Sequence, residues 1–212
     1  ETFLHEFGHL LHHIFAGHQR WADISGISTE QDFVEAPSQL LEEWAWDAPT
    51  LQTFAKDWKT GQAIPGELVT KMRAARDFGK GLQVSQQMFY AKLSLSLYDR
   101  DPKGLNTTEM VKNVQNKYGK FRFIDGTTMQ TGFGHLDGYS AVYYTYMWSL
   151  VIAKDLFTPF QKKGSIMNAP QARKYRRTIL APGSAKPAAK MVREYLGRAP
   201  RFDAFRKWLD EG

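Results

Sequence analysis

Hydrophobic side chains recur at intervals of three and four residues along most of the chain, which is the spacing of one face of an α-helix. In the first such segment the apolar positions are Leu4, Phe7, Leu11 and Phe15. They predict a helix over residues 1–16, and the chain as a whole is expected to be all-α and built from many helices. The same interval predicts further helices at about residues 32–46, 66–78, 81–98, 107–118, 138–162, 169–179, 185–196 and 202–210.

The exception to the helical spacing is the segment KFRFIDGTTMQTGFGHLD, residues 120–137. Phe121 and Phe123 alternate with polar residues ahead of an Asp125-Gly126 turn, which is a hairpin signal. We therefore expect at most a short β-hairpin near residues 120–133, which would lead into a glycine-rich loop.

The helix expected at residues 185–196 has signals at both ends. Ser184 follows a Pro-Gly turn and is a suitable N-cap, because its hydroxyl can accept from a free N–H of the first turn. Gly197 can end the helix, because glycine adopts the left-handed conformation that a C-terminus needs.

Composition indicates a packed protein with one sizeable core or two small ones. The 212 residues are 42% hydrophobic and 14% aromatic. No apolar stretch is long enough to cross a bilayer, so we expect no membrane insertion. The chain has no cysteine, so disulfides and thiolate ligands are excluded and a metal would be held by His, Asp or Glu.

Charge is unevenly distributed along the chain. Residues 1–50 hold nine acidic residues against one basic residue, and five of the six histidines; residues 151–212 hold fourteen Lys and Arg against five acidic residues. The basic residues of this last third recur at helical spacing among apolar positions, which is typical of a solvated helix face, so we expect no nucleic-acid partner. Carboxylates and imidazoles together in the first quarter suit a divalent cation.

The segment FLHEFGHLLHH, residues 3–13, carries the most specific chemistry. His5 and His9 are four residues apart, so on a helix both imidazoles project from one side, one turn apart, as two ligands for one ion. Glu6 completes the spacing H-E-x-x-H, which places a carboxylate where it could take a proton from a metal-bound water. The alternative is an amphipathic helix that happens to contain histidines.

A catalytic zinc needs a third protein ligand and one open position. A histidine three or four residues beyond His9 is too far along the axis to join the first pair, so a second helix must contribute. Glu35 stands at the head of the next expected helix, residues 32–46. The candidates after His9 are His12, His13, His18, Asp23, Glu30, Asp32 and Glu35.

HEFGHLLHH followed by SGISTEQDFVEAPSQLLEEWAWD resembles the catalytic segment of the thimet oligopeptidase family of zinc metallopeptidases, which includes oligopeptidase A, dipeptidyl carboxypeptidase and mitochondrial intermediate peptidase. The segments FGHLDGYSAVYYTYMWS and LAPGSAKPAAKMVREYLGRAPRFDAF are also similar to the family. The resemblance implies a zincin-like catalytic domain with one Zn²⁺ per chain. His5, His9 and Glu35 would hold the metal, and Glu6 would act as general base.

The second of these blocks carries three phenols. Tyr139, Tyr143 and Tyr146 are spaced i, i+4 and i+7, so on a helix they share one face, and phenolic O–H groups can donate to an oxyanion. The alternative is core packing. The resemblance implies that Tyr139 and Tyr146 stabilise the transition state and that His135 and Tyr143 hold the substrate backbone; we place Gly138 of the same loop with the substrate-binding residues.

The resemblance also implies that residues 1–212 are the C-terminal, zinc-bearing part of a longer peptidase whose N-terminal half is absent. The expected activity is hydrolysis of peptide bonds in short oligopeptides, by an endo- or exopeptidase. The alternative is an inert domain that binds metal and peptide without turnover, because the other half of the substrate channel is missing. The expected compartment is bacterial cytoplasm or periplasm, with no targeting segment to read.

The remaining histidines and acidic residues have simpler interpretations. His12, His13 and His18 are expected at the surface or in helix packing rather than on a metal. Ligating imidazoles often donate their second N–H to a carboxylate. Asp32 is therefore a candidate for orienting a ligand, and either Glu42 or Glu43 could orient His5 or His9 instead of facing solvent.

Overall fold

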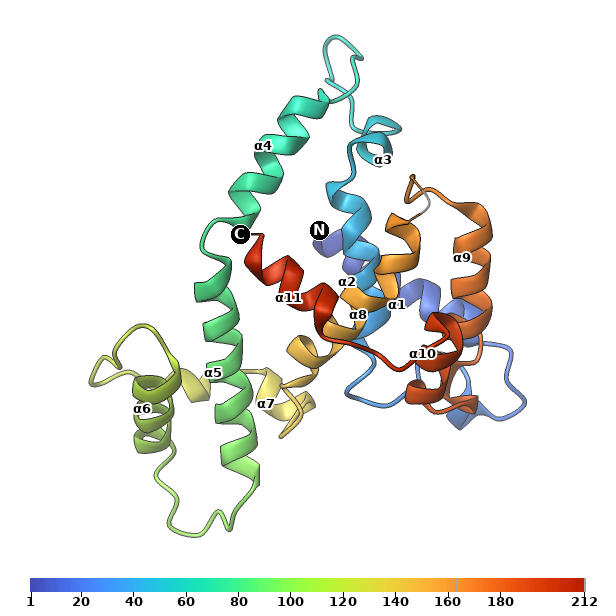
Figure 1. Ribbon diagram of the computed structural model, residues 1–212. Helices are drawn as coiled ribbons and strands as arrows, with labels where there is room; N and C mark the ends of the chain where they lie inside the picture. The colour runs from blue at the N-terminus through green and yellow to red at the C-terminus, as the bar shows by residue number, and fades with distance from the viewer. Residues whose placement is uncertain (163, 212) are drawn as a thin grey trace. The chain divides into compact units, whose positions relative to one another are not determined.

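Helices run through the whole of the computed structural model, which describes residues 1–162 and 164–211 (Figure 1). The all-α class is confirmed. Within these described residues the only β pairing is an isolated antiparallel bridge between Lys56 and Ala63. The described helices include none that combines the length and the apolar character needed to cross a membrane.

The chain forms two compact units, with residues 79–148 in the second and the rest in the first. Helix α8, Thr145–Gln161, contributes its first turn to the second unit and its remainder to the first. The first unit also contains α1 Thr2–Ala16, α2 Glu35–Glu42, α3 Ala48–Gln52, α4 Gly66–Asp77, α9 Ala169–Tyr175, α10 Ala188–Leu196 and α11 Asp203–Asp210. The second contains α5 Lys80–Tyr98, α6 Thr107–Tyr118 and the short α7 His135–Gly138.

Helices α1 and α2 pack against each other at a glycine. A Cβ atom added to Gly8 would lie 2.6 Å from the Cα of Ser38, so only hydrogen fits between the two backbones. The buried positions of α1 are Gly8, His12 and Ala16, at intervals of four residues along one face of the helix. Gly8 lets α1 and α2 approach closely, whereas Ala16 lies against Gly183, at which an added Cβ would come within 2.9 Å of the Ala16 Cβ.

The core of the first unit covers α2 from the other side. Phe33, Ala36 and Leu40 are buried together with Leu156 of α8 and with residues of the C-terminal helices. The Ser149 hydroxyl of α8 donates to the backbone oxygen of Asp32, 3.1 Å away. The segment that carries Glu35 is therefore fixed by α1 on one side and by α8 on another.

The helix expected from residue 185 begins later, at Ala188, and Ser184 is not its N-cap. The backbone N–H of Ala188 donates to Oε1 of Glu30, 2.9 Å away, so a carboxylate from a distant loop replaces the local cap. The Ser184 hydroxyl donates instead to the backbone oxygen of Ser28. The expected stop is confirmed, because Gly197 ends α10 in the left-handed conformation.

The second unit has its core between α5 and α6. Phe89 and Leu93 pack against Met110, Val111 and Val114. The hairpin expected near residues 120–133 is wrong, because no strand forms among those residues, all of which the structure describes.

Side chains of α6 form the hydrogen bonds with the backbone of this segment that a second strand would have formed in a hairpin. The Gln115 amide donates to the backbone oxygens of Phe121 and Arg122, and the Asn116 side chain accepts from the N–H of Phe123. Only the turn at Asp125-Gly126 remains of the hairpin, with Gly126 at φ +85°.

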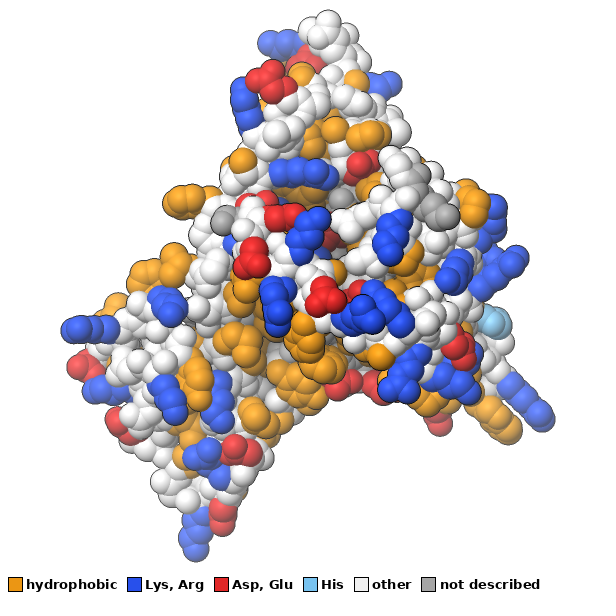
Figure 2. All heavy atoms as spheres, viewed as in Figure 1, with side chains coloured by type: hydrophobic (Ala, Val, Ile, Leu, Met, Phe, Trp, Pro, Cys, Tyr) orange, Lys and Arg blue, Asp and Glu red, His pale blue; other side chains and the backbone are white. Residues whose placement is uncertain are grey.

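The basic cluster of residues 173–177 lies at the surface as expected, whereas Lys154 of the last third is buried and pairs with Glu43. Arg173, Lys174, Arg176 and Arg177 are exposed, while the apolar positions between and after them are buried. Figure 2 shows Lys and Arg side chains spread over the visible face with Asp and Glu side chains between them.

Candidate metal centre

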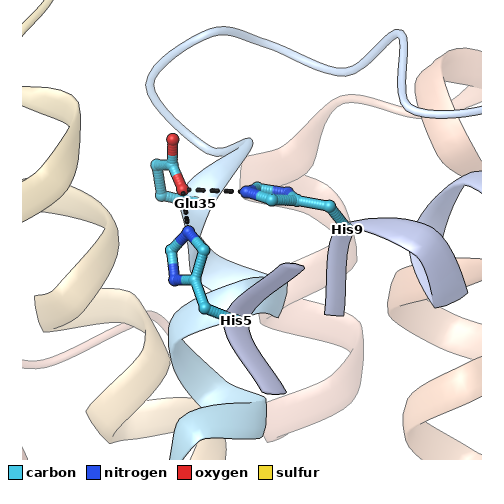
Figure 3. A group of neighbouring side chains, drawn as sticks. All are labelled: His5, His9 and Glu35. Atoms are coloured by element: carbon cyan, nitrogen blue, oxygen red, sulfur yellow. Dashed lines mark ion pairs between the residues drawn. The ribbon is translucent and has the colours of Figure 1, made fainter. Parts of the chain in front are cut away.

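Three side chains from α1 and α2 converge on one point (Figure 3). The Nε2 atoms of His5 and His9 each lie 3.2 Å from Oε2 of Glu35. The two imidazole rings are 4.9 Å apart between centroids and lie edge to face. One donor atom from each residue lies within 4.8 Å of the others.

The two histidines share a side of α1 because they are one helical turn apart. Glu35 is the first residue of α2 and is only 1% exposed. The Ser38 hydroxyl, one turn further along α2, donates to the backbone oxygen of Glu35 at 2.9 Å and reaches its Oε2 at 3.2 Å. Because α1 carries the histidines and α2 carries Glu35, the close approach of these helices at Gly8 sets the distance from the imidazoles to the carboxylate.

Glu42 contacts the ring nitrogen of His5 that faces away from Glu35. Its Oε1 is 2.6 Å from Nδ1 of His5, so the imidazole is held between two carboxylates, one at each ring nitrogen. Of the two carboxylates considered from the sequence, Glu42 contacts a motif histidine, whereas Glu43 pairs with Lys154. An Nδ1–H bonded to a carboxylate leaves Nε2 free to bind a metal.

These contacts change the acid strength of the imidazole. Burial alone would lower the pKa of His5, but the hydrogen bonds and negative charges of Glu35 and Glu42 raise it to about 10. Burial raises the pKa of Glu42, with the neighbouring Glu1 carboxylate adding to the rise, while His5 acts to lower it. At neutral pH the His5 imidazole that faces these carboxylates is therefore protonated.

The residues present fit Zn²⁺. Two imidazole nitrogens and one carboxylate oxygen are a ligand set of catalytic zinc sites, with one coordination position left open. A carboxylate as deeply buried as Glu35 needs a positive partner, which a cation between it and the histidines would supply. Among residues 1–162 and 164–211, this is the only group of three or more potential ligands whose donor atoms converge in this way.

Glu6 lies outside the converging group. It follows His5 on α1, and its side chain is exposed. An exposed carboxylate next to a ligand is open to solvent and to a substrate, as a proton-transfer group must be, and its role as a general base stays a prediction.

The other candidate ligands lie elsewhere. His13 and His18 are exposed. His12 is fully buried against α2, and neither ring nitrogen has a hydrogen-bond partner within the described residues. Burial, with the nearby His9 and His13, lowers the pKa of His12 to about 4, so the ring is neutral and acts as a packing residue.

A second group of candidate residues lies in the other unit. The His135 ring is 5.8, 5.2 and 5.7 Å from the rings of Tyr139, Tyr143 and Tyr146, between centroids. The Tyr143 and Tyr146 rings are 5.0 Å apart. We call His135 and the three tyrosines the tyrosine cluster. The sequence-predicted residues thus form two groups, the metal centre in the first unit and the tyrosine cluster in the second.

The tyrosines do not share a helical face, which corrects the expectation of one helix over residues 138–162. Helix α8 begins at Thr145, and residues 139–144 form turns. Ser140 has φ +48°, a left-handed conformation that interrupts a right-handed helix. Tyr139 and Tyr143 are nevertheless brought to His135 by this turn.

Tyr143 is the most enclosed of the three phenols, at 7% exposure. Burial and the neighbouring Tyr146 raise the pKa of its hydroxyl to about 12, although a hydrogen bond with Gln87 acts in the opposite direction. The hydroxyl therefore stays protonated and is suited to donate a hydrogen bond. Gly138 ends α7 immediately before Tyr139, where an added Cβ would meet nothing within 4 Å.

Two contributors were not predicted from the sequence. The Ser38 hydroxyl hydrogen-bonds the Glu35 carboxylate. Its position three residues after Glu35 on a helix is the feature of the sequence that could have predicted this contact. Gly8 controls the helix approach, and a glycine inside a strongly helical pattern is a recognised sign of close packing.

Comparison with known proteins identifies the family to which these features belong. The model of the family described as Peptidase family M3 matches residues 1–211. The chain is 34% identical to dipeptidyl carboxypeptidase of Escherichia coli over 95% of its own length and 30% of the relative's. It is 32% identical to oligopeptidase A of Escherichia coli over 96% of its length and 30% of the relative's. Human mitochondrial intermediate peptidase is 31% identical over 97% of this chain and 28% of its own length.

Proposed function

Because the chain belongs to peptidase family M3, we propose that it is the metal-bearing part of a zinc metallopeptidase that hydrolyses peptide bonds in short oligopeptides. One observation carries the proposal: the Nε2 atoms of His5 and His9 both face one carboxylate oxygen of Glu35. That arrangement provides three ligands and leaves one position for a water or a carbonyl.

His5, His9 and Glu35 would hold the metal, and Glu42 would keep the His5 ring in the orientation that presents Nε2. When bound, Zn²⁺ lowers the pKa of a coordinated water and polarises a carbonyl. Glu6 takes the proton from the attacking water and later gives it to the leaving amine.

The tyrosine cluster supplies the hydrogen-bond donors. Tyr139 and Tyr146 donate their O–H groups to the carbonyl oxygen as it gains negative charge. His135, Tyr143 and Gly138 contact the backbone of the peptide.

Short peptides are proposed as substrates because the relatives include an oligopeptidase and a dipeptidyl carboxypeptidase. The chain spans less than a third of the length of these relatives. As the family resemblance implies, we propose that an N-terminal half of the same polypeptide is a partner that completes the substrate channel. Peptide binding without turnover is the alternative for the 212 residues alone.

The test measures zinc content together with cleavage of a quenched fluorescent peptide, in this chain and in the full-length protein. We expect His5→Ala, His9→Ala and Glu35→Ala each to lower bound zinc greatly. Glu6→Gln should keep zinc and lose turnover, because Glu6 moves protons and is not a ligand. His18→Ala, an exposed histidine outside the metal centre, is the matched control and should behave as the parent.

Two results would contradict the assignment. Glu6→Gln as poor in zinc as His5→Ala would remove the distinction between base and ligand. A zinc-loaded full-length protein that binds the peptide without cleaving it would favour the inert binding domain.

A further inference from the structure

Ser94 of α5 lies where the turn that carries the tyrosines departs from helical geometry. Its hydroxyl donates to the backbone oxygen of Ser140 at 2.5 Å. The same oxygen atom, Oγ, accepts from the N–H of Tyr143 at 3.4 Å. Ser94 is fully buried, so water does not compete for these bonds.

The two bonds replace two that a continuous helix would make. In a helix, the oxygen of Ser140 would accept from the N–H of Tyr144, and the N–H of Tyr143 would donate to the oxygen of Tyr139. Here the Tyr139 oxygen accepts instead from Val142, as in a tight turn. A single hydroxyl thus satisfies one acceptor and one donor that the turn leaves unpaired.

The conformation stabilised in this way is a strained one. Ser140 is the only non-glycine residue at positive φ among those the structure describes. In the left-handed region the Cβ of an L-residue lies too close to the following carbonyl oxygen, so neighbouring contacts must hold the turn in place.

Two further side chains of α5 act on the same segment. The Tyr98 hydroxyl donates to the backbone oxygen of Leu136 at 2.5 Å. The Gln87 side chain hydrogen-bonds the Tyr143 hydroxyl. Gln87, Ser94 and Tyr98 are spaced i, i+7 and i+11 and so lie along one face of the helix. This face of α5 contacts the segment both before and after Ser140.

We propose that Ser94 is a positioning residue, whose buried hydroxyl holds the Ser140 turn and thereby sets Tyr139 and Tyr143 beside His135. The consequence for peptide binding rests on the proposed function. The effect of Ser94 on the conformation of the turn is independent of the proposed function.

The test compares Ser94→Ala with Ser96→Ala. Both remove a buried serine hydroxyl from α5, but only Ser94 reaches the turn. Amide hydrogen exchange of residues 142–144 should accelerate about tenfold in Ser94→Ala, as expected for the loss of a buried hydrogen bond, and stay at the parental rate in Ser96→Ala. Ser94→Thr keeps a hydroxyl and should restore most of the protection.

The kinetic arm uses a quenched fluorescent peptide with the zinc-loaded full-length protein. In Ser94→Ala the KM should rise about tenfold with unchanged zinc content, because the substrate-contacting Tyr143 is displaced while the metal centre is intact. Thermal melting of every variant verifies folding.

Each outcome bears on the proposal. Exchange at parental rate in Ser94→Ala overturns the inference. Faster exchange with the same KM and kcat as Ser96→Ala also overturns it, since the hydroxyl would then be structural only. A parent protein without peptidase activity would refute the proposed function instead, and the exchange result would still decide whether Ser94 holds the turn.

Discussion

The metal centre and the tyrosine cluster are assembled in different ways. His5, His9 and Glu35 project from regular helices whose separation is set by backbone contact at Gly8. Tyr139 and Tyr143 project from an irregular turn that the buried hydroxyl of Ser94, on another helix, holds in place.

The contrast shows two sources of precision in one chain. Helix geometry fixes the ligands of the first group, and a change there must move a helix. Hydrogen bonds from one face of α5 fix the second group, so the loss of a single hydroxyl can change it. Rigid helices suit the proposed metal ligands, whereas a held turn would suit the proposed peptide-contacting groups, which must adapt to a substrate.

The largest effect is expected for Tyr146→Phe. Removal of one donor to a developing oxyanion costs about 3 to 4 kcal/mol of barrier, so kcat should fall roughly a hundredfold to a thousandfold. Zinc content should stay at the parental level, because Tyr146 is not a ligand. Steady-state kinetics on the full-length enzyme check this, with Tyr118→Phe, an exposed tyrosine outside the cluster, as control. Cleavage at the parental rate would make the tyrosine cluster a packing feature.

Gly8→Ala should damage the metal centre through the backbone. The added Cβ would meet the Ser38 Cα at 2.6 Å, so α1 and α2 must separate, at a cost of about 2 to 3 kcal/mol in the free energy of unfolding. Zinc affinity should fall as Glu35 moves from the histidines. Denaturant unfolding and metal titration measure both effects.

The matched control lies in α5 of the other unit. Gly81 has nothing within 4 Å of an added Cβ, so Gly81→Ala should stabilise the protein by about 0.5 to 1 kcal/mol through helix propensity. Equal effects of the two substitutions would mean that the close contact at Gly8 does not control the metal centre.

Glu42→Gln should lower zinc affinity about tenfold to a hundredfold, because a neutral amide orients and polarises His5 less than a carboxylate does. Competition with a metal-sensitive dye measures the change. Glu43→Gln, at the adjacent position and paired with Lys154, should leave the affinity unaltered. An equal loss in both variants would point to general electrostatics rather than to the contact with His5.

The smallest effect concerns the pH dependence of the metal-free protein. Because the pKa of His5 is raised from 6.5 to about 10, its protonated form stabilises the folded state. This contribution is complete below pH 6.5 and is lost as the pH rises toward 10, so the free energy of unfolding should fall across that window. The zinc-saturated protein should not show the fall, since His5 is then neutral at every pH in this window. The measurement is the free energy of unfolding as a function of pH. If it has the same pH dependence in the metal-free and the zinc-saturated protein, His5 is not charged in the metal-free form.

The sequence predicts the geometry of the candidate metal centre more completely than that of the tyrosine cluster. The spacing of His5 and His9 defines their geometry once a helix forms. The residue pattern leaves Glu35 as one of several candidates, at the head of the next expected helix, and the family resemblance assigns it as the third ligand. Its distance from the histidines, however, depends on how closely Gly8 lets the helices approach, which is a tertiary contact.

The errors share one physical cause. The hairpin near residues 120–133 does not form because Gln115 and Asn116 of α6 supply the backbone partners. The helix at residues 138–144 is broken by a turn that Ser94 stabilises. In each case a side chain of a neighbouring helix satisfied backbone groups that local periodicity assigned to regular structure.

The residues around the metal centre lie close together in the sequence, and this has a consequence for the order of folding. His5, His9, Glu35 and Glu42 fall within one short stretch of chain, so closure of the connection between α1 and α2, residues 17–34, is enough to bring the candidate ligands together. The core that covers α2 also requires α8, which lies more than a hundred residues later in the chain. Short loops close early and distant contacts late. Zn²⁺ present during refolding would therefore act on the first contacts to form, and should accelerate refolding rather than only slow unfolding.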